Sequence, residues 1–405
     1  MKRRKFLQYA SLLGTAGITA VGCHGWVARS VAAPSQQKRL IVLFLRGGLD
    51  GLSVVVPYRE ADYYELRRGI AIPKPGEEEG AIDLDGRFGL HPALEEIMPL
   101  WEQNSLAFIH ACGSPDSTRS HFDAQFDIET GTPREQSTID GWMNRVLAAL
   151  PQGTPTQAVS VGTTTPYILK GSMAVANLPR GRRAGRELTI DRPQVNAAFD
   201  RLYSGDDALS QAYREGDTAR EILLAELQAE TEEANAGAPP PGDFVRNARR
   251  MARLMVGDAH TQLGFLELGG WDTHINQKGR LSRALKPVGE GLAVLVRELG
   301  SLYEDTTIVV MSEFGRTVAV NGNGGTDHGY GNAMWVLGGG IHGGRVLGEW
   351  PGLAESQRHE GRDLAITTDF RNAIAPLLTQ HLQIPDGKLS DIFPGFRVDP
   401  KLNLF

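Results

Sequence analysis

Apolar residues occur along this chain in short uninterrupted runs, and these runs predict buried β-strands. Six of them are rich in Val, Ile and Leu: residues 39–46, 105–111, 158–162, 263–268, 306–312 and 333–339. Continuous apolar runs of this length are typical of strands covered on both faces, as in a parallel sheet. We therefore expect a sheet that is mostly parallel.

Helical patterns lie between most of these runs. The clearest covers residues 281–302, where Leu and Val recur at alternating steps of four and three, with Pro287 expected to kink the helix. Strands that alternate with helices predict an α/β fold, in which ligands bind beyond the C-terminal ends of the strands. The strand ends are therefore the places to look for chemistry.

The pattern loosens between about residues 170 and 240. A basic stretch, LPRGRRAGRE, leads into an acidic helical segment that closes with the proline-rich APPPGD. We expect a helical insertion here, with the proline run as a linker.

The N-terminus predicts an export signal. Arg3 and Arg4, followed by a short apolar stretch rich in small residues, resemble the twin-arginine signal, and residues 1–33 are expected to be cleaved. An alternative is lipidation at Cys23, which follows the small residues TAVG. We expect a periplasmic or secreted protein that meets the twin-arginine translocase and touches a membrane only through the signal or a lipid anchor.

Removal of this signal changes the charge and the cysteine content. Residues 1–33 contain five basic residues and no acid, so the formal charge moves from −6 to −11. Such a protein has no electrostatic reason to bind nucleic acid. Cys112 is then the last cysteine, which excludes an internal disulfide.

Residue types that bind metal ions flank three of the predicted strands. They are Asp272, His274, Glu313, Asp327 and His328, and Arg316 follows Glu313 at the same strand end. Asp272 and His274 are two residues apart, so they point to the same side of an extended chain. Carboxylates and imidazoles that converge suit Zn, Mn or a similar divalent ion, although each pair alone also fits a loop hydrogen bond or a salt bridge. Together they predict a metal or anion site.

The first predicted strand ends in Arg46, and two glycines and Asp50 follow. A guanidinium group at this place suits a phosphate, sulfate or carboxylate group, or pairs with Asp50.

A short helix is predicted directly after Ser120, because the apolar pattern over residues 122–128 ends at Gly131. Helix starts attract anions. Three interpretations stay open: Ser120 as a nucleophile, His121 as a site residue without covalent chemistry, or Ser120 as a plain helix cap with His121 in the first turn.

Six segments occur in an order that resembles a known group of exported proteins, domain of unknown function family 1501 (DUF1501). The segments are FLRGGLDG, GLHPAL, TRSHFDAQ, GGWDTH, SEFGRT and TDHGYGNAMWVLGGG, and the resemblance covers residues 38–396. The family looks related to the alkaline phosphatase and sulfatase superfamily. This resemblance implies a three-layer α/β/α fold of the alkaline phosphatase type and a divalent metal ion, Zn, Mn or Ca.

The resemblance also implies roles for single residues. His328 matches the late metal histidine, Asp272 and His274 match the middle metal pair, and Glu313 matches what is left of a third pair. Two positions depart from the superfamily: Arg46 stands where a metal-binding Asp is usual, with Asp50 four residues later, and His121 stands at the nucleophile position.

The leading hypothesis is a metal-dependent hydrolase of sulfate or phosphate esters, small molecules or glycans, with Arg46 and Arg119 holding the anion. Asp272, His274, Glu313 and His328 would hold the metal, with Asp50 and Asp327 as further candidates, and water would attack the ester. The alternative is a non-catalytic descendant that binds anionic glycans or an exported partner, which the replacements at Arg46 and His121 favour.

Overall fold

A computed structural model describes residues 37–133, 138–151, 153–162, 164–178, 193–207, 209–210, 213–214, 217, 242–399 and 402–405. The expected signal peptide at residues 1–33 lies outside these ranges, and so does much of the expected insertion at 170–240. Within the insertion the described elements are β7 (Ala176–Leu178) and α7 (Pro193–Leu202). None of the helices in the described ranges has the length and apolar character that crossing a membrane requires.

The described strands form one large and one small sheet. The large sheet has nine strands, in the order β11 (Arg345–Leu347), β5 (Leu106–Gly113), β10 (Asn332–Gly338), β9 (Thr306–Met311), β1 (Arg39–Arg46), β8 (Leu263–Gly269), β6 (Ala158–Val161) and β7, with β12 (Thr368–Asp369) also paired to β5. The small sheet contains β2 (Val55–Val56), β4 (Gly89–Leu90) and β3 (Ile82–Asp83). All six predicted strands are confirmed, each to within two residues at either end.

The direction of β10 corrects the prediction of a parallel strand at 333–339. β1 runs parallel to β8 and β9, and β6 runs parallel to β8, but β10 is antiparallel to both β5 and β9. Within the described ranges β10 alone runs against the rest of the large sheet, so a mixed α/β fold with a mostly parallel sheet is confirmed. A buried antiparallel strand is as apolar as a buried parallel one, which is why composition did not separate them.

Helices cover both faces of this sheet. The longer described helices are α5 (His121–Thr130), α6 (Trp142–Ala149), α9 (Asp243–Gly257) and α10 (Gln277–Leu299), and the shorter ones are α2 (Gly51–Val54), α3 (Ala61–Leu66), α4 (Met98–Glu102), α11 (Phe370–Pro376) and α12 (Leu389–Ile392). Short stretches of other helix types lie at η1 (Pro92–Ile97), η2 (Pro155–Gln157), η3 (Tyr167–Leu169), η6 (Gly300–Asp305), η7 (Glu355–Gln357), η8 (Leu377–His381) and η9 (Asp386–Lys388). The helix predicted at 281–302 corresponds to α10, which continues through Pro287.

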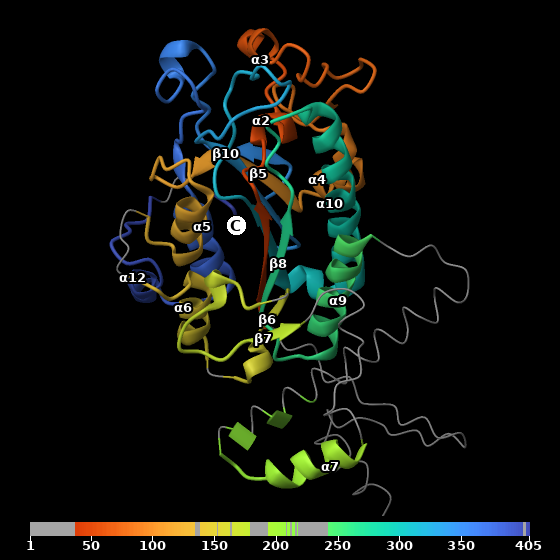
Figure 1. The fold of residues 1–405 in the computed structure, drawn as a ribbon, viewed down its shortest axis with the longest axis vertical. Helices are drawn as coiled ribbons and strands as arrows, with labels where there is room; N and C mark the ends of the chain where they lie inside the picture. Colours follow the sequence, from red (N-terminus) through yellow and green to blue (C-terminus); the bar gives the residue numbers. More distant parts are fainter. Residues whose placement is uncertain are drawn as a thin grey trace, which may run out of the picture. The chain divides into compact units, whose positions relative to one another are not determined.

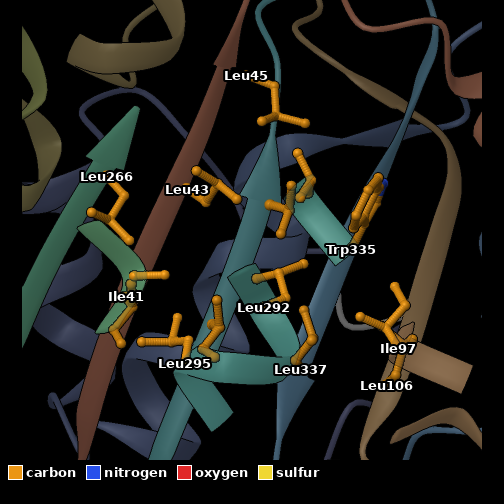
Figure 2. Packing of buried hydrophobic residues seen from close by; sticks show 14 of the residues in the cluster. Ile41, Leu43, Leu45, Ile97, Leu106, Leu266, Leu292, Leu295, Trp335 and Leu337 are labelled. Carbon is orange, nitrogen blue, oxygen red and sulfur yellow. The ribbon is translucent and has the colours of Figure 1, made fainter. Parts of the chain in front are cut away.

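Alternate residues of β1 explain the three layers, because successive side chains of a strand point to opposite faces. Ile41, Leu43 and Leu45 pack in one buried cluster with leucines of α10 (Figure 2). The intervening Leu40, Val42 and Phe44 belong to a second cluster, with residues of α6 and α11. In Figure 1, α9 and α10 accordingly lie on one side of β8, and α5 and α6 lie on the other.

Candidate metal centre

The antiparallel direction of β10 brings the candidate residues to one edge of the sheet. Asp272 and His274 lie in the loop after β8, and Glu313 and Arg316 lie after β9. His328 precedes β10, and because that strand runs the other way, its start meets the ends of its neighbours. A parallel β10 would have placed His328 at the opposite edge.

Helix α5 brings His121 to the same edge. Ser120 is its N-cap, since the Ser120 hydroxyl accepts a hydrogen bond from the Asp123 N–H at 3.4 Å, and Gly131 ends the helix with a φ of 70°. This capping follows the usual preferences for Ser at a helix start and Gly at its end. The Ser120 hydroxyl therefore stabilises the helix end, and His121 is the residue of this pair that contacts the cluster.

Three imidazoles surround the carboxylate of Asp272. Oδ1 of Asp272 lies 2.9 Å from Nε2 of His274 and 3.2 Å from Nε2 of His328, and these two nitrogens are 3.1 Å apart. Nε2 of His121 lies 3.7 Å from Oδ2 of the same carboxylate. The ligand atoms of His121, Asp272 and His328 all lie within 4.8 Å of one another.

The other ring nitrogen of each histidine lies against an oxygen atom that accepts a hydrogen bond. Nδ1 of His121 is 2.8 Å from Oε1 of Glu313, Nδ1 of His274 is 2.9 Å from Oδ1 of Asp327, and Nδ1 of His328 is 2.8 Å from the carbonyl oxygen of Arg119. A carboxylate or carbonyl oxygen cannot donate, so each Nδ1 carries the hydrogen. In the neutral rings all three Nε2 atoms then present lone pairs toward Asp272.

This donor set fits a metal ion. A tetrahedral Zn²⁺ with bonds of about 2.0–2.1 Å separates its ligands by roughly 3.3 Å, close to the spacings around Asp272. Nε2 of His121 is buried and has no hydrogen-bond partner among the described residues, although burying an imidazole nitrogen unpaired is costly. A histidine whose second nitrogen is held by a carboxylate or carbonyl is the usual arrangement of a metal ligand. The residues that could hold an ion are therefore His121, Asp272 and His328, whose ligand atoms lie close to one another, with His274 beside them through the contacts of its Nε2 with Asp272 and His328.

Glu313 lies behind His121 and does not face the open side of the cluster. Its side chain is fully buried, and its Oε1 accepts hydrogen bonds from Gly47 N–H, Gln125 Nε2 and His121 Nδ1, each at 2.8 Å. Burial raises the pKa of Glu313, but the hydrogen bonds from His121 and Gln125 outweigh it, and the pKa falls below its ordinary value. The Glu313 carboxylate is thus ionised, and one of its hydrogen bonds orients His121.

Asp327 has the same relation to His274. Its Oδ1 accepts hydrogen bonds from His274 and from Asn321 Nδ2 at 3.1 Å, and the bond from His274 lowers the pKa of Asp327. Asp327 therefore orients a ring that faces Asp272.

The pKa values of the cluster favour a charged Asp272. Partial burial raises the pKa of Asp272, but Arg316 Nη2 at 2.5 Å outweighs it, so the pKa lies below its ordinary value. The pKa of His121 is raised by its bond to Glu313, whereas burial lowers the pKa of His328. The Asp272 side chain is 46% exposed, so solvent reaches the cluster.

Arg46 and Asp50 lie outside the cluster. Arg46 donates to Glu267 at 2.6 Å, Glu129 at 2.8 Å and Gln125 at 3.0 Å, so it reaches His121 only through Gln125 and Glu313. Asp50 is fully buried and pairs with a buried Arg67 at 2.5 Å, which replaces the expected pair with Arg46.

Arg119 lies on the rim of the cluster. Its backbone carbonyl holds His328, while its guanidinium group donates to Glu360 at 2.6 Å and to Asp363 at 2.8 Å. Of the two carboxylates, Asp363 is buried and Glu360 is exposed.

Two contributors to the site were missed from the sequence, Gln125 and the contact of Arg316 with Asp272. Gln125 lies four residues after His121, so both side chains project from the same face of α5, and this spacing was a usable signal. The contact of Arg316 with Asp272 joins two loops that are distant in sequence, so no local sequence pattern predicts it.

Comparisons with known proteins give one family match. The model of the family described as "Protein of unknown function (DUF1501)" matches residues 37–386. A search of curated proteins gave no match.

Solved structures resemble the chain more distantly. The C-terminal periplasmic domain of EcEptC from Escherichia coli is 10% identical, with 90% of this chain and 89% of that chain covered and a TM-score of 0.39. Ps i-CgsB in complex with k-i-k-neocarrahexaose is 12% identical, with 88% and 74% covered and a TM-score of 0.37. Alkaline phosphatase from the Antarctic bacterium TAB5 is 9% identical, with 75% and 92% covered and a TM-score of 0.31. All three TM-scores lie below 0.5, so the chemistry of this chain has to follow from its own residues.

Proposed function

The chain belongs to the DUF1501 family, and we propose that it is an exported, metal-dependent hydrolase of phosphate or sulfate esters. The observation that carries this proposal is the convergence of three Nε2 atoms, from His121, His274 and His328, on the carboxylate of Asp272. Each of these rings is oriented from behind by a fixed acceptor, as metal-binding histidines usually are. The position of the cluster at the strand ends also accords with the alkaline phosphatase-like architecture that the sequence resemblance implies.

The donor types favour a transition metal. Imidazole nitrogens suit Zn²⁺ and similar ions, whereas Ca²⁺ takes oxygen ligands. Of the metals considered from the sequence, Zn²⁺ therefore fits a set with three imidazoles and one carboxylate best, and Ca²⁺ fits it least.

Residues of the chain itself position the reaction. A divalent ion held in this cluster would polarise an ester oxygen and lower the pKa of water. The Ser120 hydroxyl caps α5, so we propose that water, rather than a side chain, attacks the ester. Glu313 keeps the His121 proton on Nδ1, and Arg316 keeps Asp272 turned toward the histidines.

Arg119 is the residue that we propose to hold the anionic part of the ester. An exposed ion pair such as Arg119 with Glu360 contributes little stability, so an incoming anion can replace the Glu360 carboxylate. Arg119 and Arg362 would then share the single carboxylate of Asp363, which leaves one positive charge for the substrate. Arg46 contacts two carboxylates and Gln125, and we assign it to positioning rather than to anion binding.

Export of the protein is part of the proposal and rests on the sequence. Arg3 and Arg4 precede a short apolar stretch, as in twin-arginine signals. Replacing both by lysine should leave the protein in the cytoplasm, as measured by cell fractionation, while the unaltered chain reaches the periplasm. Periplasmic accumulation of the double variant would contradict this route.

Turnover of model esters tests the enzymatic claim. The full mature chain, loaded with Zn²⁺ or Mn²⁺, is assayed with p-nitrophenyl phosphate, bis(p-nitrophenyl) phosphate and p-nitrophenyl sulfate. We expect hydrolysis of at least one ester, abolished in Asp272→Asn and retained in Glu267→Gln, which removes a carboxylate whose partner is Arg46. If metal-loaded protein turns over none of the esters but binds sulfated glycans, a binding protein replaces the hydrolase.

A further inference from the structure

Arg316 is a buried cation fixed against the candidate metal ligands. Its side chain is fully buried, and its only ion pair in the described part of the chain is with Asp272, at 2.5 Å. The other partners are four backbone carbonyl oxygens, at 2.6–3.1 Å, which belong to Gly47, Gly48, Trp271 and Thr326.

These carbonyl groups come from the loops that follow β1 and β8 and from the loop that precedes β10, while Arg316 itself follows β9. The guanidinium group thus connects four strand ends and cannot move away from Asp272 without breaking all of them. Displacing a buried charge that is held in this way is costly, because its partners would be left unpaired.

The carboxylates near the cluster each have partners within the protein. Glu313 accepts hydrogen bonds from three nitrogen donors on one oxygen, and Asp327 accepts bonds from His274 and Asn321. Asp50 forms a fully buried ion pair with Arg67. A second divalent ion would therefore have to share Asp272, whose Oδ1 already accepts from Arg316, with carboxylates that already orient histidines.

We infer that Arg316 takes the place of a second metal ion, so that this centre holds one divalent ion beside a permanent protein cation. In two-metal sites the ions lie about 3.5–4 Å apart and share ligands. Here the negative charge of Asp272, which would neutralise a second ion, is already paired with the Arg316 guanidinium group. The inference rests on the proposed function, because it assumes that the histidine cluster binds metal.

Arg316 is then a positioning residue and not a substrate-binding one. Each of its three side-chain nitrogens donates to an acceptor within the protein. Its effect on a substrate passes through Asp272 and through the number of metal ions that the site accepts.

Metal stoichiometry tests this inference independently of activity. The full mature chain is stripped of metal and titrated with Mn²⁺, and bound metal is measured by elemental analysis after desalting and by electron paramagnetic resonance. We expect one equivalent at saturation and the spectrum of an isolated Mn²⁺ ion. Two equivalents with a spin-coupled spectrum that disappears in Asp272→Asn would overturn the inference, whereas no bound metal at all would refute the proposed function instead.

Two variants separate the charge of Arg316 from its packing. Arg316→Lys keeps the positive charge and should still bind one equivalent, whereas Arg316→Met removes the charge and should admit a second Mn²⁺. Circular dichroism checks that both variants are folded, and equal stoichiometry in the folded pair would contradict a role for the charge. If neither variant folds, the stoichiometry of the unaltered chain still decides.

Discussion

Replacing Glu313 by Gln removes one negative charge behind His121 with little change of shape. In the variant, the amide oxygen can occupy the Oε1 position and still accept from His121, Gln125 and the Gly47 N–H. The new NH₂ group then faces the Ser312 hydroxyl oxygen, which lies 2.9 Å from Oε2 and can accept from it. The fold should therefore survive the change.

The loss in metal affinity follows from the His121 hydrogen bond. A hydrogen bond to a charged group contributes about 1.5–3 kcal/mol, against about 0.5–1.5 kcal/mol for a neutral one. The hydrogen bond that holds the His121 ring in its metal-binding orientation is therefore weakened by roughly 1–1.5 kcal/mol. Since about 1.4 kcal/mol is a factor of ten, the dissociation constant should rise about tenfold. Second partners of metal histidines typically contribute about 10–100-fold, which agrees.

Competition with a chelator of known affinity, or calorimetric titration with Zn²⁺, measures this change. The matched control is Glu267→Gln, which removes a carboxylate near the end of β8 whose partner is Arg46 rather than an imidazole. We expect the control to stay within about twofold of the unaltered chain, less than 0.5 kcal/mol. Unchanged affinity in a folded Glu313→Gln variant, with reduced affinity in the control, would refute the role of Glu313.

Further predictions concern metal, pH, glycine and anion binding. Zn²⁺ at one hundred times its dissociation constant should stabilise the chain by about 2.7 kcal/mol in thermal unfolding. A chelator or the substitution His328→Asn should abolish this stabilisation. Stabilisation by Zn²⁺ that persists in the variant would contradict the proposed metal site. Burial lowers the pKa of His110 to about 4, below the ordinary 6.5. Between these two pH values the unfolded chain binds a proton that the folded chain does not. The free energy of unfolding should therefore fall by about 3 kcal/mol as the pH drops from 6.5 toward 4. Denaturant titrations should therefore show a shallower loss in His110→Gln, and equal slopes would refute this. Gly47→Ala should lower stability and metal affinity more than Gly69→Ala. Both glycines have a positive φ, but a Cβ at Gly47 would lie 2.8 Å from a backbone nitrogen of the loop after β8, whereas a Cβ at Gly69 would meet open space. Equal losses in the two variants would contradict this steric reason. Glu360→Gln should tighten inhibition of ester hydrolysis by inorganic sulfate or phosphate, and weaker inhibition would exclude the proposed exchange at Arg119.

The sheet was predictable from the sequence because buried strands leave a strong signal. The run at 39–46 contains residues for both faces, and the structure places alternate members in two different clusters. The direction of β10 was not predictable, because it depends on pairing with β5 and β9 rather than on its own residues.

The site was only partly predictable, for a similar reason. Asp272, His274 and His328 were expected near one another from their places at strand ends, and the structure brings them together. Glu313 and Asp327 look like ligands in sequence, since a carboxylate that binds metal and one that orients a histidine are the same residue type. Only three-dimensional contacts show that Glu313 lies behind His121.

The most direct measurement of the central claim is the position of the metal by anomalous diffraction. Crystals of the mature chain are grown with Zn²⁺, and data are collected above and below the zinc absorption edge. The account predicts an anomalous peak about 2.0–2.2 Å from Nε2 of His121 and His328 and from a carboxylate oxygen of Asp272. A peak elsewhere, or an intact cluster without metal at saturating Zn²⁺, would contradict it.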